Sequence, residues 1–161
     1  MARHIYIHNP FCVRKCPYCD FYSVTKTSLC EDFYKAAVRE AEIIGSVITD
    51  NAGTNPVTDK DGKDTVYFGG GTPSLPDSRL VCGLLDSVRK AFNIASDAEI
   101  TIEVNPSSVT SEKLSDYLQA GFNRVSVGVQ SLDDGVLKTL GRLHDSRGAV
   151  DAIEKITRAG F

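Results

Sequence analysis

The sequence of 161 residues lacks the segments that direct a chain to a membrane or out of the cell. Its first residues, Met1 to His4, hold no apolar signal region, and no apolar run approaches the length of a membrane span. A basic excess is also missing, because 18 Lys and Arg stand against 21 Asp and Glu, for a net charge of −3. We therefore expect a cytoplasmic protein of one domain that has no nucleic acid as a partner.

Cysteine is sparse but clustered. Three of the five cysteines follow one another at a spacing of C-x3-C-x2-C: Cys12, Cys16 and Cys19. That spacing would place them on one face of a helix, but Pro10 and Pro17 favour an irregular loop, since proline breaks a helix. In a reducing compartment, clustered cysteines are typically metal ligands or catalysts. Cys30 and Cys82 fall on predicted helices, where free cysteine packs as a small apolar residue.

Two kinds of metal centre are compatible with this loop. A structural zinc ion needs four ligands, and the fourth would have to come from His8, Cys30 or Cys82, which lie at no short ligand spacing from the other three. A [4Fe–4S] cluster is usually held by four thiolates. Three thiolates would leave one iron free to bind a substrate or cofactor. The spacing favours the cluster over zinc without excluding zinc.

Four segments with strand patterns alternate with helical segments. We predict strands at 4–8, 65–68, 99–105 and 124–130. We predict helices from Ser28 with Glu31 as its capping-box partner, and over 77–92, 110–121, 133–140 and 146–160, the last two capped by Asp133 and Ser146. Residues 50–64 have the composition of a long surface loop. The alternation predicts right-handed βα units and a parallel sheet, and an antiparallel sheet with one solvated face is the alternative.

Each predicted strand has one apolar and one polar face. The polar faces read His4/Tyr6/His8, Thr65/Tyr67/Gly69, Thr101/Glu103/Asn105 and Ser126/Gly128/Gln130. A closed eight-stranded barrel would fill its interior with branched apolar side chains instead. We therefore expect the polar face to line an open lumen that holds a polar ligand, and the apolar face to meet the helices.

Each strand also ends in an unusual segment, and parallel α/β folds bind ligands at that end of their strands. The second ends in Gly69–Ser74, a Gly-Gly-Gly-Thr-Pro-Ser run, which lets backbone approach a ligand and is not a Walker loop. The third carries Glu103, whose buried carboxylate needs donors. Ribose hydroxyls would supply them, and an ion pair with Arg124 or Arg142 is the alternative.

The C-x3-C-x2-C loop after the first strand resembles that of radical S-adenosylmethionine (SAM) enzymes. The longer string Tyr-x-His-x-Pro-Phe-Cys, closing in Cys-Asp-Phe, resembles the oxygen-independent coproporphyrinogen III oxidase family, and more narrowly its haem chaperone branch. The resemblance implies that Cys12, Cys16 and Cys19 hold a [4Fe–4S] cluster whose fourth iron binds SAM. Reduction of the cluster then cleaves SAM to methionine and a 5′-deoxyadenosyl radical.

The resemblance also implies which residues bind SAM. Gly70, Gly71 and Thr72 would contact its amino-acid end, and Glu103 its ribose. Other residues match family positions near the cofactor: Tyr6, Tyr18, Gln130 and Arg142. The family fold is an incomplete (βα)6 barrel followed by a smaller C-terminal domain. We therefore expect residues 1–161 to be an N-terminal portion with about four βα units and an open edge after the fourth strand.

Two functions compete within the family. One is a haem chaperone that delivers haem to client proteins; the other is oxidative decarboxylation of coproporphyrinogen III propionates to vinyl groups. The dehydrogenases typically extend the motif to C-x3-C-x2-C-x-C, whereas Asp20 and Phe21 follow Cys19 here, which favours the chaperone and argues against the enzyme. The implied partners are haem or a porphyrin, an electron-donor protein and a haem-accepting client protein. Contact with a membrane is expected only through such a client. A zinc-bound structural domain is the third hypothesis.

Overall fold

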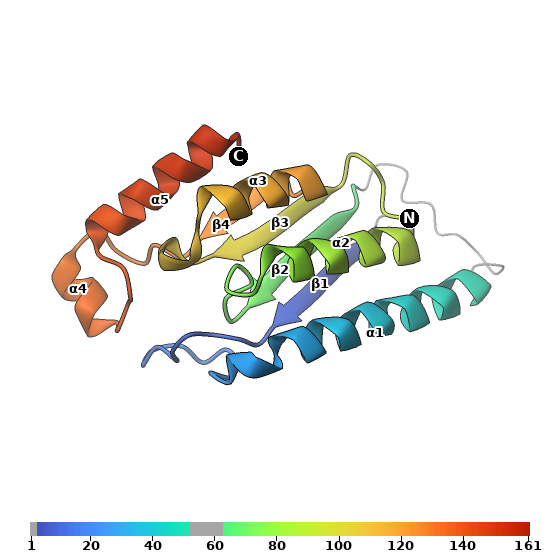
Figure 1. Cartoon of the computed structure of the whole chain (residues 1–161), viewed down its shortest axis with the longest axis horizontal. Helices are drawn as coiled ribbons and strands as arrows, with labels where there is room; N and C mark the ends of the chain where they lie inside the picture. The colour runs from blue at the N-terminus through green and yellow to red at the C-terminus, as the bar shows by residue number, and fades with distance from the viewer. Residues whose placement is uncertain (1–2, 52–62) are drawn as a thin grey trace.

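The computed structural model describes residues 3–51 and 63–161, with the side chains of 49–51 left aside. Its strands are β1 (His4–Asn9), β2 (Thr65–Gly70), β3 (Glu99–Val104) and β4 (Arg124–Val127). Its helices are α1 (Cys30–Asn51), α2 (Ser78–Phe92), α3 (Ser111–Ala120), α4 (Asp134–Thr139) and α5 (Ser146–Ala159), with short 3-10 turns η1 (Thr27–Leu29) and η2 (Pro106–Ser108) (Figure 1). Within the described ranges, no helix combines the length and the apolar character that crossing a membrane requires.

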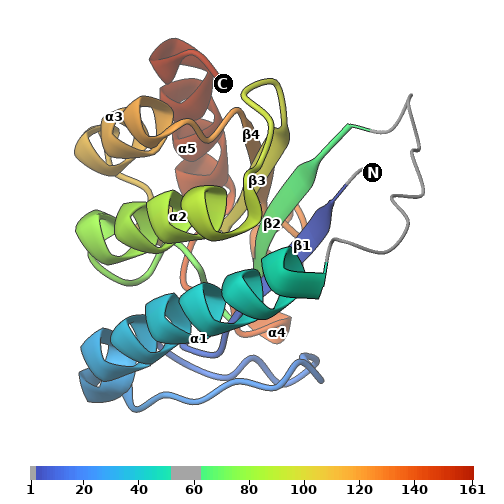
Figure 2. The ribbon, with the colours of Figure 1, turned by 90° about the vertical axis from the view of Figure 1, so that its right-hand side faces the viewer.

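The four strands form one sheet in the order β1-β2-β3-β4, and every neighbouring pair is parallel. The predicted parallel sheet is therefore confirmed and the antiparallel alternative is wrong. The helices α1, α2 and α3 cover one face of the sheet (Figure 2). Because the four strands are parallel, their C-terminal ends lie at the same edge of the sheet, and the loops that follow them start there.

The face parity read from the sequence decides which side is the core. Val66, Phe68, Ile100 and Ile102 are all buried beneath the helices. The Phe68 ring meets Phe122 edge-on, with ring centroids 5.1 Å apart. Burying one such side chain contributes about 1.5–3 kcal/mol, so this apolar face supplies a large part of the stability of the sheet.

Several predicted strand ends and helix caps are wrong. The second strand continues to Gly70 instead of ending at residue 68. Ser28 lies inside η1 and is not the N-cap that was predicted. The N-cap of η1 is Lys26, which makes no side-chain capping hydrogen bond, and α1 begins only at Cys30. Asp145, not Ser146, caps α5 by accepting the Gly148 N–H at 2.7 Å. The fourth strand stops at Val127 instead of reaching residue 130. The predicted cap at Asp133 is confirmed.

The predicted loop over 50–64 lies largely outside the described residues, and its last residue is not part of an exposed loop. Asp64 is buried and accepts hydrogen bonds from the backbone N–H groups of Arg3 at 2.7 Å and Ala95 at 2.9 Å. The Arg3 guanidinium lies 3.2 Å from the same carboxylate. Burial disfavours the Asp64 anion, but these donors and the Arg3 charge outweigh it, so the pKa of Asp64 lies below its usual value.

We expect Asp64→Ala to lower the free energy of unfolding by about 1–3 kcal/mol at neutral pH, because two backbone donors lose their acceptor. A carboxyl with a lowered folded pKa stabilises the fold above its unfolded pKa, and this contribution disappears as the pH falls through the folded value. The difference between the two proteins in urea unfolding should therefore shrink in acid. Asp86→Ala, which removes only an exposed pair with Lys90, should cost less than about 0.5 kcal/mol. Equal losses in both variants would contradict this role of Asp64.

Candidate functional site

The segment that carries the three clustered cysteines is a closed loop. It leaves β1 at Pro10 and returns at Val24, whose N–H donates to the Pro10 carbonyl at 2.7 Å while the Cys12 N–H donates to the Val24 carbonyl at 3.0 Å. Phe11 is buried and meets Phe33 of α1 edge-on, with centroids 5.4 Å apart. The irregular loop expected from the prolines is confirmed, and one aromatic side chain ties it to the core.

The triple-glycine run lies directly against this loop. The Gly71 N–H donates to the Asn9 carbonyl at 2.7 Å, and the Thr72 N–H donates to the Phe11 carbonyl at 2.8 Å. A Cβ at Gly71 would come within 2.7 Å of the Phe11 oxygen and 3.0 Å of the Cys12 Sγ. Gly70 has φ of +107°, a conformation that favours glycine. The glycines are therefore required by the close approach of the protein's own backbone, besides any ligand.

A cavity of about 380 Å³ opens between the cysteine loop and the strand ends, within the size range of ligand sites. Its walls include almost every residue singled out in the sequence: Cys12, Cys16, Tyr18, Cys19, Gly70, Gly71, Thr72, Glu103, Gln130 and Arg142. Tyr6 is the exception. Its ring stacks on Tyr67, with centroids 6.1 Å apart, and its hydroxyl lies 3.2 Å from His8 Nδ1.

Glu103, on the polar face of the sheet, accepts hydrogen bonds from donors within the protein. Its carboxylate accepts the Tyr67 hydroxyl at 2.7 Å and the Gly70 N–H at 3.2 Å. The predicted alternative of an ion pair is wrong in the described part of the chain, because Arg124 pairs with Glu99 at 3.7 Å and Arg142 bonds elsewhere. Burial, and then the hydrogen bond and charge of Glu103, raise the pKa of Tyr67. Sequence reasoning missed Tyr67 as a partner, although strand parity had placed both on one face.

Arg142 connects three parts of the site. Its guanidinium donates to the Gly128 carbonyl at 2.8 Å, to the Tyr18 hydroxyl at 3.3 Å and to the Cys16 Sγ at 3.9 Å. Its Nε is buried and has no hydrogen-bond partner in the described residues. This side chain therefore holds the end of β4 against the cysteine loop and brings a positive charge to the cavity wall.

A buried histidine, His144, contacts the turn that follows β4. Gln130 adopts a φ of +69°, and the buried His144 donates from Nε2 to the carbonyl of the adjacent Val129 at 3.0 Å. Burial lowers the pKa of His144, with the Arg142 charge adding to the effect and the Val129 hydrogen bond opposing it. A neutral imidazole is thus favoured, with its proton on Nε2.

The arrangement of the thiols bears on the kind of metal centre. Residues 3–51 and 63–161 contain no group of three His, Cys, Asp or Glu side chains close enough to grip a single ion. A structural zinc ion needs four such ligands around one point, whereas the thiolates of an iron–sulfur cluster bind separate irons. The thiols of Cys12, Cys16 and Cys19 all line the main cavity.

The remaining two cysteines lie apart from this cavity. Cys30 begins α1, and the Cys82 thiol on α2 donates to the Asp116 carbonyl at 3.7 Å. Burial, with smaller effects of the Asp116 and Asp77 carboxylates, raises the pKa of Cys82 to about 11. Cys82 is thus a thiol at neutral pH, as its predicted packing role requires.

Comparison with known proteins gives this geometry a context. The family model described as the radical SAM superfamily matches residues 6–161. The chain is similar to the haem chaperone HemW of Escherichia coli, at 40% identity over 159 residues, which cover 98% of this chain and 39% of that protein. It is 36% identical over 155 residues to the mitochondrial radical S-adenosyl methionine domain-containing protein 1 of Bos taurus, covering 96% of this chain and 33% of that protein.

A solved structure shares the fold. The coproporphyrinogen III oxidase HemN of Escherichia coli, described as a radical SAM enzyme, superposes with a TM-score of 0.81 at 25% identity, covering 99% of this chain and 35% of that one. The open four-stranded sheet therefore corresponds to part of a radical SAM barrel, as predicted. The chain spans between a third and two-fifths of the length of these curated relatives.

The contact between the glycine run and the cysteine loop can be tested by adding one methyl group. We expect Gly71→Ala to lower the free energy of unfolding by about 1–3 kcal/mol, because its Cβ would overlap the Phe11 carbonyl and the Cys12 sulfur. Gly83→Ala is the matched control, since nothing lies within 4 Å of its Cβ and alanine favours the interior of α2 by about 0.5–1 kcal/mol. Urea unfolding that found Gly71→Ala as stable as Gly83→Ala would contradict the tight contact.

Proposed function

The chain belongs to the radical SAM superfamily, and from this we propose that Cys12, Cys16 and Cys19 bind a [4Fe–4S] cluster and that SAM occupies the cavity beside them. We further propose that residues 1–161 form the N-terminal portion of a radical SAM core domain that serves in haem delivery. The observation that carries the proposal is the meeting of three thiols, a glycine run, an acid and an arginine around one cavity.

The residues around the cavity suit the two ends of SAM. Glu103 already accepts two hydrogen bonds, and the free lone pairs of a carboxylate can accept ribose hydroxyls as well. The Arg142 guanidinium suits the carboxylate of the amino-acid end, since planar guanidinium groups bind carboxylates through paired hydrogen bonds. Between them, Gly71 and Thr72 bring backbone to the cavity wall.

When bound, the cluster supplies the electron that cleaves SAM. The role of the chain is to hold both groups in contact and to limit the access of water and oxygen. Phe11 anchors the cysteine loop, while the two hydrogen bonds from Gly71 and Thr72 hold the start of the loop beside the end of β2. A reducing cytoplasm is the compartment that we propose, because thiolate ligands have to stay reduced to bind iron.

Delivery of haem is favoured over porphyrin oxidation by the cysteine loop and by the relatives. Phe21 lies on the cavity wall at the position where the C-x3-C-x2-C-x-C pattern carries its last cysteine. Two relatives of 40% and 35% identity, from Escherichia coli and Haemophilus influenzae, bear the name haem chaperone HemW. The alternative, coproporphyrinogen oxidation, is supported by the common fold with HemN. An electron donor and a haem-accepting client protein are the partners that this function requires.

The cluster ligands are tested by serine substitution. We expect Cys12→Ser, Cys16→Ser and Cys19→Ser each to prevent a stable [4Fe–4S] cluster after anaerobic reconstitution with iron and sulfide. Cys30→Ser and Cys82→Ser are the controls and should keep the iron content of the unsubstituted protein, because their thiols lie outside the cavity. Iron and sulfide analysis with electron paramagnetic resonance, with and without SAM, reads the result. A full iron complement in Cys16→Ser would overturn the assignment.

An experiment on the full-length protein distinguishes haem delivery from coproporphyrinogen oxidation. After reconstitution with cluster and SAM, we expect it to bind haem, as followed by absorption titration. It should not convert coproporphyrinogen III to the divinyl product, because the cavity lacks the last cysteine of the dehydrogenase motif. Product chromatography after anaerobic incubation decides between them. Steady formation of the divinyl product that depends on SAM would establish the oxidase instead.

A further inference from the structure

A polar side chain interrupts the apolar face of β1 at the point where this strand passes into the cysteine loop. Strand alternation places Asn9 on the same face as Ile5 and Ile7, toward the helices. Asn9 is completely buried there. Burial of an amide costs free energy unless its polar atoms find hydrogen-bond partners. Such a residue on an otherwise apolar face often marks a place where function outweighs packing.

Both polar atoms of the Asn9 side chain have partners. The Nδ2 donates to the Phe11 carbonyl at 3.2 Å, and the Oδ1 accepts the hydroxyl of Tyr34, on α1, at 3.3 Å. Because a backbone carbonyl can only accept, the amide nitrogen has to face Phe11 and the amide oxygen has to face Tyr34. We call these two hydrogen bonds, from Tyr34 through Asn9 to Phe11, the Asn9 bridge.

Tyr34 is suited to remain a donor in this bridge. Its side chain is buried, and its ring meets Phe33 edge-on with centroids 5.7 Å apart. Burial, and then the neighbouring Tyr117 and Cys30, raise the pKa of Tyr34. The Tyr34 hydroxyl therefore keeps the proton that it donates to Asn9.

The Asn9 bridge ends on a peptide unit that includes the first clustered cysteine. The Phe11 carbonyl also accepts the Thr72 N–H at 2.8 Å, so its two lone pairs are both used. On the other side of the same planar peptide unit, the Cys12 N–H donates to the Val24 carbonyl at 3.0 Å. Three hydrogen bonds thus fix the plane that joins Phe11 to Cys12, and Asn9 supplies the one that comes from a side chain.

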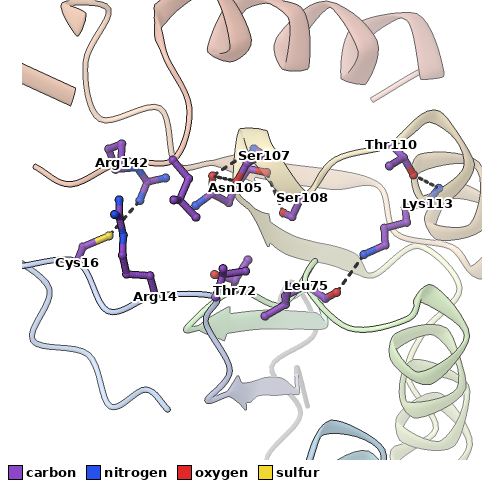
Figure 3. A pocket seen from close by; sticks show the side chains of 12 residues that line it. Arg14, Cys16, Thr72, Leu75, Asn105, Ser107, Ser108, Thr110, Lys113 and Arg142 are labelled. Atoms are coloured by element: carbon purple, nitrogen blue, oxygen red, sulfur yellow. Dashed lines mark hydrogen bonds between the residues drawn. The ribbon is translucent and has the colours of Figure 1, made fainter. Parts of the chain in front are cut away.

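The orientation of this peptide plane decides where the Cys12 thiol lies. The Cys12 Sγ is 3.5 Å from the Thr72 hydroxyl. Figure 3 shows Thr72 near the strand ends and Cys16 on the cysteine loop, both in the wall of a cavity of about 260 Å³ beside the main one. A rotation of the peptide plane would move the first thiol relative to Thr72 and to the other thiols. A metal centre tolerates misplacement of its ligands by only about 0.5 Å.

We propose that Asn9 and Tyr34 are positioning residues of the metal centre, which hold the Cys12 thiol in place through the Phe11 carbonyl. Neither residue lines the main cavity, so they act through the backbone and not by contact with the cluster or SAM. The consequence for the cluster rests on the proposed function. The Asn9 bridge itself is a property of the metal-free protein and can be tested there.

The first test compares two buried tyrosines that are changed in the same way. Tyr34→Phe removes the hydroxyl that donates to Asn9, whereas Tyr117→Phe removes a buried hydroxyl that has no hydrogen-bond partner among the described residues. Hydrogen exchange in the metal-free full-length protein is followed at the amides of Cys12 and Thr72. We expect Tyr34→Phe to speed their exchange about fivefold, as the loss of one hydrogen bond predicts, and Tyr117→Phe to change it less than twofold.

The amides of β3 show whether this effect is local. We expect their exchange to be unchanged in Tyr34→Phe, because the Asn9 bridge does not reach that strand. Equal acceleration in β3 and at Cys12 and Thr72 would indicate a general loss of stability and would overturn the positioning role. Unchanged exchange at Cys12 and Thr72 would overturn it as well.

The second test follows the cluster in a variant that removes both hydrogen bonds. Asn9→Leu keeps a branched side chain of similar shape, and we expect it to bind iron and sulfide on anaerobic reconstitution. Its cluster should have a more negative midpoint potential, because the Thr72 hydroxyl no longer reaches the Cys12 sulfur and hydrogen bonds to the sulfurs set this potential. Loss of iron to a chelator should be about tenfold faster. A redox titration followed by electron paramagnetic resonance measures the potential.

Thr101→Val is the matched control, since it removes the hydrogen bonds of another buried polar side chain, on β3, outside the main cavity wall. It should leave both the potential and the rate of iron loss unchanged. The same potential and rate in Asn9→Leu as in the unsubstituted protein would overturn the proposal. Tyr34→Phe gives the same two readouts if Asn9→Leu does not fold. If the unsubstituted protein binds no cluster, the proposed function fails, and the exchange measurement alone decides whether the Asn9 bridge positions Cys12.

Discussion

The site depends on two backbone hydrogen bonds that continue the pairing of β1 and β2 beyond the ends of these strands. The N–H groups of Gly71 and Thr72 donate to the carbonyls of Asn9 and Phe11, so the cysteine loop starts as a continuation of the sheet. Only glycine at position 71 leaves room for the Phe11 carbonyl and the Cys12 sulfur. The first cysteine is thus positioned by strand pairing, which is far stiffer than a free loop.

Charge is distributed unevenly over the rim of the sheet. Among the described residues, Glu103 is the one acid in the wall of the main cavity. It lies on the lumen side, where the Tyr67 hydroxyl and the Gly70 N–H donate to it. The cations Arg14, Arg142 and Lys113 lie toward the loops and helices. A ligand that spans the rim therefore meets an acceptor at one end and donors at the other. This polarity suits a zwitterionic molecule with hydroxyl groups better than a uniformly apolar one.

Much of the fold was predictable because strand parity is a local property. Val66, Phe68, Ile100 and Ile102 alternate with polar residues, and alternation alone decides which face meets the helices. Caps and strand ends were harder to predict, since neighbouring polar residues compete for the same role. Asp145 took the cap that Ser146 was expected to form. The strand β4 ends at Val127, before a turn in which Gln130 has a positive φ and His144 donates to the Val129 carbonyl.

The sequence by itself determined the class of protein and the residues around the main cavity. Cysteine spacing, the glycine run and Glu103 are short-range patterns that a chain carries whether or not it is folded. The partners of those residues were decided only by the tertiary structure. Tyr67 reached Glu103, and Arg142 reached Cys16 across 126 positions of sequence. Such pairs form because parallel βα units bring the ends of distant strands to one edge of the sheet, and no local pattern encodes which side chains then meet.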